Sequence, residues 1–418
     1  MASLIRRATL AAGLRTSSRT SVATVAAPAS SARCAAAALH SSATATAEIV
    51  SDAEAAGQFG AVPMMRGGGG RSSNSGLTVA VFGCTGQLGR VVVNELGRTG
   101  STVIIPSRGD DCEWRHLKVM GDYGKIVPRY FELRDADSIA AAVEGADVVV
   151  NLIGKHYETK HALPWWINYT MDDVHHEGAR SVAAAAKACP TVKHFVHVSA
   201  LAQDADSPSE WAASKARGEA AVREAWGDSA TIVRPADIFG PDDRLINHYA
   251  VSAKALPVLP LADGGGAKLQ PVYARDVAEV IQRCVELPRF LSGRTVELAG
   301  PEVMTERALV DFVLDTIQEG TPVLDVPQKL AEHAGFAAQH TPNPMLTRDQ
   351  VKLRAIDNVL EGTEAAEGVV RFEHLAMEPA TLRDVAIPFL IRYKSESHFV
   401  EEGTSRDDFI RDREQQQQ

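Results

Sequence analysis

One stretch near residue 80 constrains the fold of this chain more than any other. A short valine-rich run at residues 77–82 leads into three glycines with two residues between each pair: Gly83, Gly86 and Gly89. Apolar residues then recur at the spacing of one helix face, and they are Leu88, Val91, Val92 and Leu96. The pattern predicts a strand, a tight turn and a helix, the first unit of a parallel α/β sheet that binds a dinucleotide.

Each glycine of this turn has its own physical task in such a unit. The first permits the turn, the second lets backbone N–H groups approach a pyrophosphate, and the third lets the helix pack closely on the strand. A glycine triplet is more informative here because a strand precedes it and an amphipathic helix follows it. We therefore predict a phosphate-binding turn made of Gly83, Thr85, Gly86, Gln87, Leu88 and Gly89.

Strand and helix patterns continue to alternate as far as residue 240. Apolar runs predict strands at 102–106, 146–153, 194–199 and 230–235, and residues 129–135 predict a strand and a turn. Helical periodicity predicts helices at 138–143, 174–188 and 211–226. The alternation implies a doubly wound parallel sheet with right-handed crossovers, a Rossmann domain over residues 77–240. Residues 155–173 form an irregular insertion, in which Trp165 and Trp166 either pack the loop or form a substrate cage.

Beyond residue 240 the alternation is less regular. We predict a smaller, irregular C-terminal α/β subdomain over residues 241–400 that completes the sheet and docks to partners. Within it, residues 270–273 look like a return to the sheet, 293–298 a further strand, and 274–287 and 306–317 helices. Residues 401–418 are expected to be a polar tail.

The first 47 residues have a different composition from the rest. No acidic residue precedes Glu48, and arginines lie among alanine, serine and threonine: Arg6, Arg7, Arg15, Arg19 and Arg33. A basic, hydroxylated segment without acids is typical of an organelle transit peptide, here predicted to be mitochondrial. A plastid transit peptide and an ordinary disordered tail are the alternatives. Residues 48–76, with four consecutive glycines, indicate a flexible connector.

Charge and hydropathy argue against several classes of partner. The chain of 418 residues has a net charge of −10 and no basic cluster in its body, which argues against nucleic acid. No run approaches the ~18 apolar residues that span a bilayer, so any membrane contact is predicted to be peripheral. The cysteines are scattered, and His194 and His197 point to opposite faces of their strand, so no metal site is predicted.

The residue after the second predicted strand bears on which nucleotide binds. An acidic side chain here binds the ribose 2′-hydroxyl of NAD, whereas an arginine accommodates the 2′-phosphate of NADP. The strand at 102–106 is followed by Ser107 and Arg108, about twenty residues beyond Gly89, as the fold requires. We predict that Arg108 binds NADPH; an arginine that is merely solvated at a strand end is the alternative.

The strand predicted at 146–153 is a continuous apolar run that ends in glycine. Such a run is typical of a buried parallel strand whose carboxyl end meets a ligand. We therefore predict that Leu152, Ile153 and Gly154 contact the nucleotide.

The order of these motifs resembles the extended branch of the short-chain dehydrogenase/reductase superfamily. The glycine turn, a turn at Asp135, Gly178 and the segment from Arg234 to Pro241 all occur in family order. The resemblance implies that the nucleotide site also includes Asp135, Pro235 and Ile238.

Within that branch, further short motifs resemble the NADPH-binding accessory subunits of mitochondrial respiratory complex I. They cover about residues 70 to 360 and include Met120-Gly121-Asp122, Asn151-Leu152-Ile153-Gly154, Gln270-Pro271-Val272-Tyr273 and Thr347-Arg348-Asp349. The resemblance implies a protein on the matrix side of the mitochondrial inner membrane, docked to other complex I subunits in the quinone-reducing part of the matrix arm. It also implies a bound NADPH that is not turned over in electron transport.

Active members of the superfamily use a serine, a tyrosine and, four residues later, a lysine. The lysine lowers the pKa of the tyrosine, whose phenol exchanges a proton with the substrate. Here Ser199 and Lys215 occupy the expected positions, but Trp211 stands in place of the tyrosine. An indole N–H is only a donor, so no catalytic residue is predicted. Ser199 and Lys215 are expected instead to bind the nicotinamide ribose.

These residues favour a non-catalytic subunit in which NADPH is a structural cofactor that supports assembly. Two alternatives remain open. In one, Tyr157, His156 or His161 supplies the missing proton in an NADPH-dependent reductase or isomerase. In the other, the chain is a free regulator that senses NADPH.

Overall fold

The computed structural model of the chain describes residues 74–158, 169–339, 344, 346–360, 362 and 368–394. Several predictions fall outside the described residues: the transit peptide at 1–47, all but the end of the connector at 48–76, the polar tail at 401–418, and the insertion residues His161, Trp165 and Trp166.

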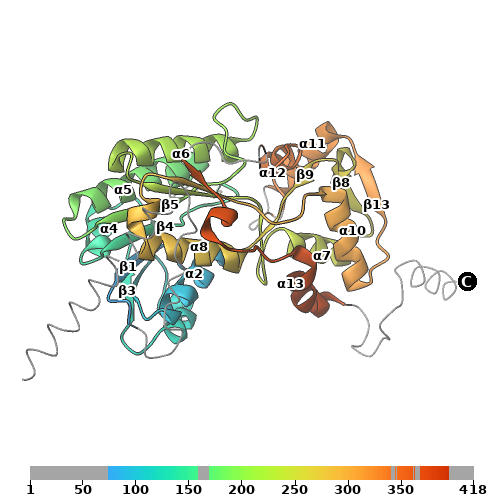
Figure 1. The fold of residues 1–418 in the computed structure, drawn as a ribbon. Helices are drawn as coiled ribbons and strands as arrows, with labels where there is room; N and C mark the ends of the chain where they lie inside the picture. Colours follow the sequence, from blue (N-terminus) through green and yellow to red (C-terminus); the bar gives the residue numbers. More distant parts are fainter. Residues whose placement is uncertain are drawn as a thin grey trace, which may run out of the picture. The chain divides into compact units, whose positions relative to one another are not determined.

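An eight-stranded parallel sheet is the centre of the Rossmann domain (Figure 1). The order of its strands is β14-β11-β6-β5-β4-β1-β2-β3. Its strands are β1 (Thr78–Phe82), β2 (Thr102–Ser107), β3 (Ile126–Tyr130), β4 (Val148–Asn151), β5 (His194–Val198), β6 (Thr231–Pro235), β11 (Thr295–Leu298) and β14 (Val369–Val370). The chain runs outward from β1 to β3 and then returns with β4 to the other side of β1. The predicted doubly wound parallel sheet is confirmed. A reversal of this kind opens a crevice at the carboxyl ends of β1 and β4.

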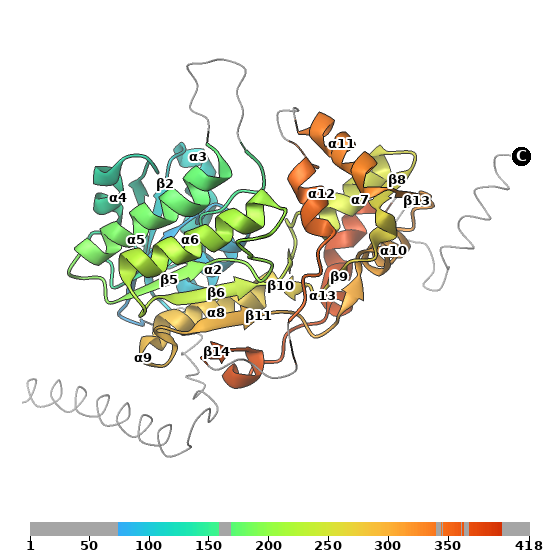
Figure 2. The same ribbon diagram turned by 90° about the horizontal axis from the view of Figure 1, so that it is seen from above.

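Helices cover both faces of the sheet (Figures 1 and 2). Helices α2 and α8 pack together on one face, and α4, α5 and α6 pack in a row on the other. Their bounds are α2 (Gln87–Arg98), α4 (Ala136–Val143), α5 (Gly178–Ala188), α6 (Glu210–Trp226) and α8 (Ala274–Glu286), with a π-helical turn, η2 (Asp173–Glu177), before α5. Because both faces are covered, residues 79–82 of β1 are fully buried. This burial explains why central strands such as β1 and β4 appear in the sequence as continuous apolar runs.

Two elements of this domain differ from prediction in their register. The third strand, predicted with its turn at residues 129–135, begins earlier, at Ile126, and ends at Tyr130 as β3. The chain then turns into α4, where the carboxylate of Asp135 accepts a hydrogen bond from the Asp137 N–H at 3.1 Å. On α2 the buried apolar face is centred on Gly89, Val92, Val93 and Leu96. Leu88 and Val91 lie on its flank and are only partly buried, whereas Gly89 packs against the backbone of Gly83 and Cys84.

The segment predicted to rejoin the sheet at residues 270–273 does not do so. Its strand β10 (Val272–Tyr273) pairs with β7 (Ile238–Phe239) in a separate two-stranded sheet. The main sheet is completed by β11, as predicted, and by β14, which comes from much later in the chain.

The C-terminal subdomain has its own apolar core, formed largely by α7, α10 and α13. Its elements are α7 (Ile246–Ala255), β8 (Leu259–Ala262), β9 (Lys268–Leu269), β12 (Met304–Thr305), α10 (Glu306–Ile317), β13 (Val323–Val326), α11 (Gln328–Ala338), α12 (Arg348–Arg354) and α13 (Leu382–Leu390). Strands β8 and β13, and β9 and β12, form two further two-stranded sheets. Short helices make the connections: α3 (Asp111–Trp114), η1 (Arg115–Met120), η3 (Asp263–Gly265), α9 (Pro288–Leu291), η4 (Phe372–Leu375) and η5 (Ile391–Tyr393).

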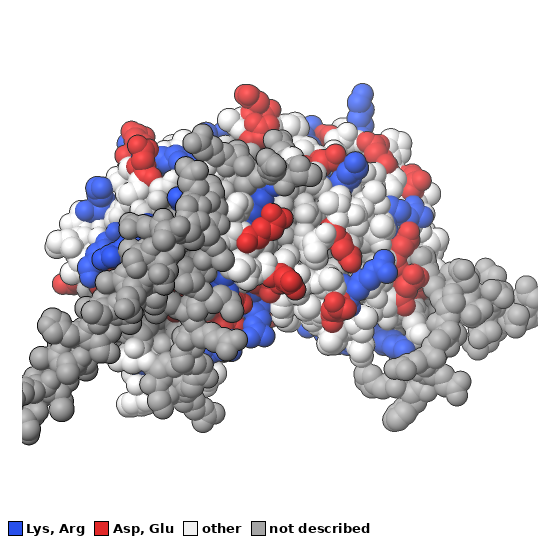
Figure 3. Space-filling model, viewed as in Figure 1, with Lys and Arg blue, Asp and Glu red and all other residues white. Residues whose placement is uncertain are grey.

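Acidic and basic side chains are interspersed on the face of the molecule shown in Figure 3, without a continuous positive patch there. Within the described ranges, no helix is both long and apolar enough to cross a membrane. The same residues contain no group of histidine, cysteine and carboxylate side chains that could hold a metal ion.

Candidate functional site

A cavity of about 560 Å³ lies at the reversal point of the sheet, between the strand ends and the C-terminal subdomain. Most of the predicted site residues line it: Gly83, Gly86, Gln87, Leu88, Gly89, Leu152, Gly154, Ser199, Lys215, Pro235 and Ile238. The sequence separates these residues by up to 155 positions, and the parallel sheet brings them together because its strands all end at the same edge.

The glycine turn directs the N-terminus of α2 toward this cavity. Gly83 has a φ of +81°, and a Cβ there would lie 3.0 Å from the carbonyl group of Leu152. A Cβ at Gly89 would lie only 2.2 Å from the Gly83 carbonyl oxygen, so α2 begins where no larger residue fits. Gly86 occupies the N-cap and provides no side-chain acceptor. The first N–H groups of α2 therefore remain available to a phosphate.

Three buried polar atoms of the cavity wall fit a polar ligand. Gln87 Nε2, Ser199 Oγ and Asn358 Oδ1 have no hydrogen-bond partner among the described residues, and all three residues line the cavity. A buried polar group without a partner costs about 1–3 kcal/mol, so proteins rarely retain several of them in one place. A ligand rich in hydroxyl, amide and phosphate groups would satisfy them.

Lys215 brings a buried positive charge to the same wall. Its Nζ donates to the Val198 carbonyl at 3.4 Å and lies 6.0 Å from the centre of the Trp211 ring. Desolvation lowers the pKa of this ammonium group from 10.5 to about 8. The group is still charged near pH 7, where its burial is a cost to the folded protein that a hydrogen-bonding ligand would reduce.

Replacing Lys215 with methionine is expected to stabilise the nucleotide-free protein by about 3 kcal/mol near pH 7. Lowering the pKa of Lys215 from 10.5 to about 8 corresponds to a free-energy penalty of that size on the charged ammonium group, and methionine does not carry this charge. The folded pKa lies below the unfolded one, so between about pH 8 and pH 10 the unfolded chain holds a proton that the folded chain has lost. Stability of the unsubstituted protein should therefore rise with pH across this window, and the Lys215→Met variant should lack that rise. Urea unfolding of both proteins at several pH values measures the difference. Equal slopes for the two would contradict it.

Trp211 is held between two histidines at the start of α6. The His156 ring stacks on it with centroids 5.7 Å apart, and the His175 ring meets it edge-on at 6.4 Å. His175 Nε2 accepts from the Lys155 N–H at 2.9 Å, so the proton of the neutral ring is on Nδ1 and is donated to Ser214 Oγ at 2.8 Å. Burial lowers the pKa of His175 well below 6.5, which keeps the ring neutral.

Tyr157 and His156, two of the alternative proton donors, both line the cavity. Desolvation, followed by the cations of Arg244 and Lys215, lowers the pKa of His156 to about 4 although the residue is open to the cavity. His156 is therefore uncharged at neutral pH. The Tyr157 ring lies under the Arg244 guanidinium, 5.2 Å from ring centre to carbon.

Arg108 lies beside the cavity and not in its wall. It is exposed at the end of β2 and makes no ion pair with a described residue. After desolvation, the charge of Arg108 is the second cause that lowers the pKa of Lys155, and Lys155 lines the cavity. Arg108 and Lys155 therefore both add to the positive potential on this side of the cavity, which favours an anionic group.

Three other predicted residues also lie outside the cavity lining. Thr85 is exposed, the Ile153 N–H donates to Asn151 Oδ1 at 3.1 Å, and Asp135 caps α4. For these three the structure provides a local structural role or solvent exposure, and a contact with nucleotide stays a prediction.

Sequence reasoning missed the wall that the C-terminal subdomain provides. The Tyr249 hydroxyl is hydrogen-bonded to both Glu306 and Arg354, and Arg354 Nη1 lies 3.2 Å from Glu306 Oε1. Burial raises the pKa of Tyr249 well above 10, so its hydroxyl stays protonated. These side chains come from α7, α10 and α12, separated by up to 105 positions, and no local pattern in the sequence marks them.

Residues 79–299, from β1 to the residue after β11, match the NAD dependent epimerase/dehydratase family. Among solved structures, an NADPH-dependent quinone oxidoreductase from Escherichia coli, crystallised with NADPH, has a TM-score of 0.54 and 20% sequence identity. The matched region covers 75% of this chain and 99% of the quinone oxidoreductase chain. At this identity the likeness shows the fold alone.

Two mitochondrial proteins are similar over most of the chain. The NADH dehydrogenase (ubiquinone) 1 alpha subcomplex subunit 9 of Arabidopsis thaliana is 37% identical over 333 residues, which are 79% of this chain and 81% of that protein. The NADH-ubiquinone oxidoreductase 40 kDa subunit of Neurospora crassa is 38% identical over 338 residues, 81% of this chain and 85% of that protein.

Proposed function

This chain belongs to the NAD dependent epimerase/dehydratase family and, within it, to the family of mitochondrial complex I subunits named above, and from this premise we propose that it is a non-catalytic accessory subunit of complex I that holds NADPH as a structural cofactor. Its place would be the matrix side of the mitochondrial inner membrane, in peripheral contact with it. Its partners would be other complex I subunits of the matrix arm and quinone module.

One observation carries this proposal: most of the residues predicted to bind a nucleotide line one cavity, while Trp211 stands where a proton-exchanging tyrosine is needed. An indole N–H donates a hydrogen bond but does not ionise near neutral pH. General acid–base catalysis is worth about 10² to 10⁴ in rate, or roughly 3 to 5 kcal/mol of barrier. A site that lacks this contribution and retains its binding groups is suited to hold a nucleotide without consuming it.

The choice of NADPH over NADH rests on the two cations beside the cavity. Arg108 follows β2, where the fold presents the adenine ribose, and Lys155 lies near enough to feel its charge. A 2′-phosphate in this positive potential would gain a charge-assisted interaction with Arg108. NADH lacks that phosphate.

A resident nucleotide would stabilise the surface that the partner subunits recognise. A ligand that binds only the folded state stabilises it by RT ln(1 + [L]/Kd), about 2.7 kcal/mol when its concentration is one hundred times Kd. This is a large fraction of the stability of an ordinary domain. NADPH would thereby hold the cavity walls, and the subdomain that forms one of them, in a single arrangement.

Two measurements test the proposal together. Mass spectrometry of the small molecules released from the natively purified protein is expected to find NADPH in near-stoichiometric amount. Blue-native electrophoresis is expected to show the protein co-migrating with complex I. A small free species, a different ligand, or steady oxidation of NADPH with a carbonyl compound would count against it and favour a regulator or a reductase.

A further inference from the structure

One wall of the cavity is a strap, defined here as residues 347–360, which comprises α12 and the segment after it. Gln350, Leu353, Arg354 and Asn358 of the strap line the cavity. Its far end is fixed to β9 and the residue after it, where Lys268 N donates to Asp357 Oδ1 at 2.8 Å and Leu360 N donates to Gln270 Oε1 at 3.0 Å. The strap therefore covers the site from the C-terminal side.

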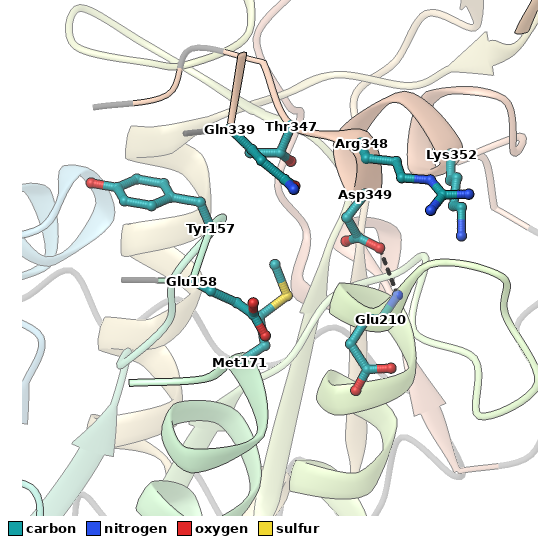
Figure 4. Close-up of a pocket in the computed structure, with 9 residues that line it drawn as sticks. All are labelled: Tyr157, Glu158, Met171, Glu210, Gln339, Thr347, Arg348, Asp349 and Lys352. Carbon is teal, nitrogen blue, oxygen red and sulfur yellow. Dashed lines mark hydrogen bonds between the residues drawn. The ribbon is translucent and has the colours of Figure 1, made fainter. Parts of the chain in front are cut away.

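The near end of the strap is fixed to the Rossmann domain by one carboxylate, Asp349. Glu210 N donates to Asp349 Oδ1 at 2.7 Å, while Trp211 N and Ser209 Oγ donate to Oδ2 at 3.1 and 3.0 Å. Figure 4 shows the carboxylate directed at the first residue of α6. Ser209 is the N-cap residue, yet its hydroxyl makes no cap of its own. A residue 138 positions away from Trp211 therefore caps the helix that carries Trp211 and Lys215.

The turn that carries Asp349 is held in place by contacts within the C-terminal subdomain, independently of α6. Thr347 and Gln350 form a capping box at the start of α12, with Gln350 N donating to Thr347 Oγ1 at 3.2 Å and Thr347 N donating to Gln350 Oε1 at 3.1 Å. On the other side α11 packs so closely that a Cβ at Gly335 would lie 2.9 Å from Arg348 N. The carboxylate is thus presented by a preformed turn, and it meets N–H groups at the positive end of a long helix.

We propose that Asp349 is a positioning residue that locks the strap onto α6 and so retains the nucleotide in the cavity. The inference rests on the proposed function, in which NADPH is resident. Within the described residues, the hydrogen bonds that join the strap to the start of α6 are those of Asp349 and one longer bond, from Lys352 Nζ to the Pro208 carbonyl at 3.4 Å. Loss of the Asp349 bonds would free this edge. Gln350 and Leu353, on the same short helix, would then move away from the nucleotide together.

The test uses the full chain loaded with NADPH and the Asp349→Asn variant. An asparagine has nearly the same size, but its amide nitrogen is a donor, so at least one of the three N–H and O–H donors loses its acceptor. We expect NADPH, followed by its fluorescence after dilution into excess NADP⁺, to dissociate about tenfold faster or more. Hydrogen exchange of the Glu210 and Trp211 amides should accelerate with it. Ser209→Ala, which removes one donor and leaves the carboxylate, should give a smaller increase and serves if Asp349→Asn does not fold.

Thr381→Ala is the matched control. Thr381 caps α13 by accepting from the Asp384 N–H at 3.3 Å and does not line the cavity. The Thr381→Ala variant should be less stable, as after the loss of any helix cap, and should release NADPH at the same rate as the unsubstituted protein. Unchanged NADPH release in Asp349→Asn, with faster amide exchange at residues 210 and 211, would overturn the lock. An unsubstituted protein that binds no NADPH at all would instead overturn the proposed function.

Discussion

Replacing Gly86 with valine is expected to abolish nucleotide binding and to deplete the chain from assembled complex while leaving its fold largely intact. Gly86 has a φ of −70° and a ψ of 172°, an extended conformation that valine adopts without strain. A Cβ there would meet only the Gly83 carbonyl oxygen, at 3.3 Å, which a small shift accommodates. The two methyl groups would then occupy the space in which the N–H groups of α2 approach a phosphate. Fluorescence titration with NADPH and blue-native gels measure the two losses.

Gly89→Ala is the contrasting variant. Its single added carbon would lie 2.2 Å from the Gly83 oxygen and 2.8 Å from Cys84 Cα, both backbone atoms that cannot move independently. We expect a destabilisation of about 3 kcal/mol, seen in urea unfolding of the nucleotide-free protein. The Gly86→Val variant should show little of this destabilisation in the same measurement. If Gly86→Val bound NADPH within a few-fold of the unsubstituted protein, the phosphate site would not lie at this turn.

Arg108→Glu is expected to weaken NADPH binding by about a hundredfold or more and to leave NADH binding nearly unchanged. The substitution removes a charge-assisted hydrogen bond worth about 1.5–3 kcal/mol and adds repulsion between two anions, and each 1.4 kcal/mol is a factor of about ten in affinity. Parallel titrations with NADPH and NADH separate the two nucleotides.

Arg289→Glu provides the control for the change of charge. Arg289 is exposed in α9, which precedes the amino end of β11 and so lies at the opposite edge of the sheet from the cavity. It should affect neither nucleotide. Equal losses of NADPH and NADH in Arg108→Glu would mean that Arg108 does not act on the 2′-phosphate.

The parallel sheet was predictable because central strands such as β1 and β4 are buried on both faces and are therefore continuous apolar runs in the sequence. The glycine turn added the position of the ligand, since Gly83 and Gly89 are required by contacts that any Cβ would violate. Register was less predictable. On α2, periodicity alone placed the buried face on Leu88, Val91, Val92 and Leu96, whereas the fold buries Gly89, Val92, Val93 and Leu96.

The C-terminal wall was not predictable from local patterns, for two physical reasons. Strands such as β9 and β10 are two residues long, too short to show any periodicity. The polar contacts are also nonlocal: Ser209 before α6 looks like an ordinary N-cap, and only the fold reveals that Asp349 takes over this role. The same holds for Tyr249, which becomes part of the site through Glu306 and Arg354.

The two outermost strands of the sheet bear on how this protein avoids aggregation. An edge strand exposes unpaired N–H and C=O groups, which can pair with an exposed strand of another chain. On one side β3 carries Pro128, which has no N–H to donate to an added strand. On the other side β14 is only two residues long, too little for a template. A truncation that removes β14 would expose the backbone of β11, which has four residues, and we expect the shortened protein to self-associate through this strand.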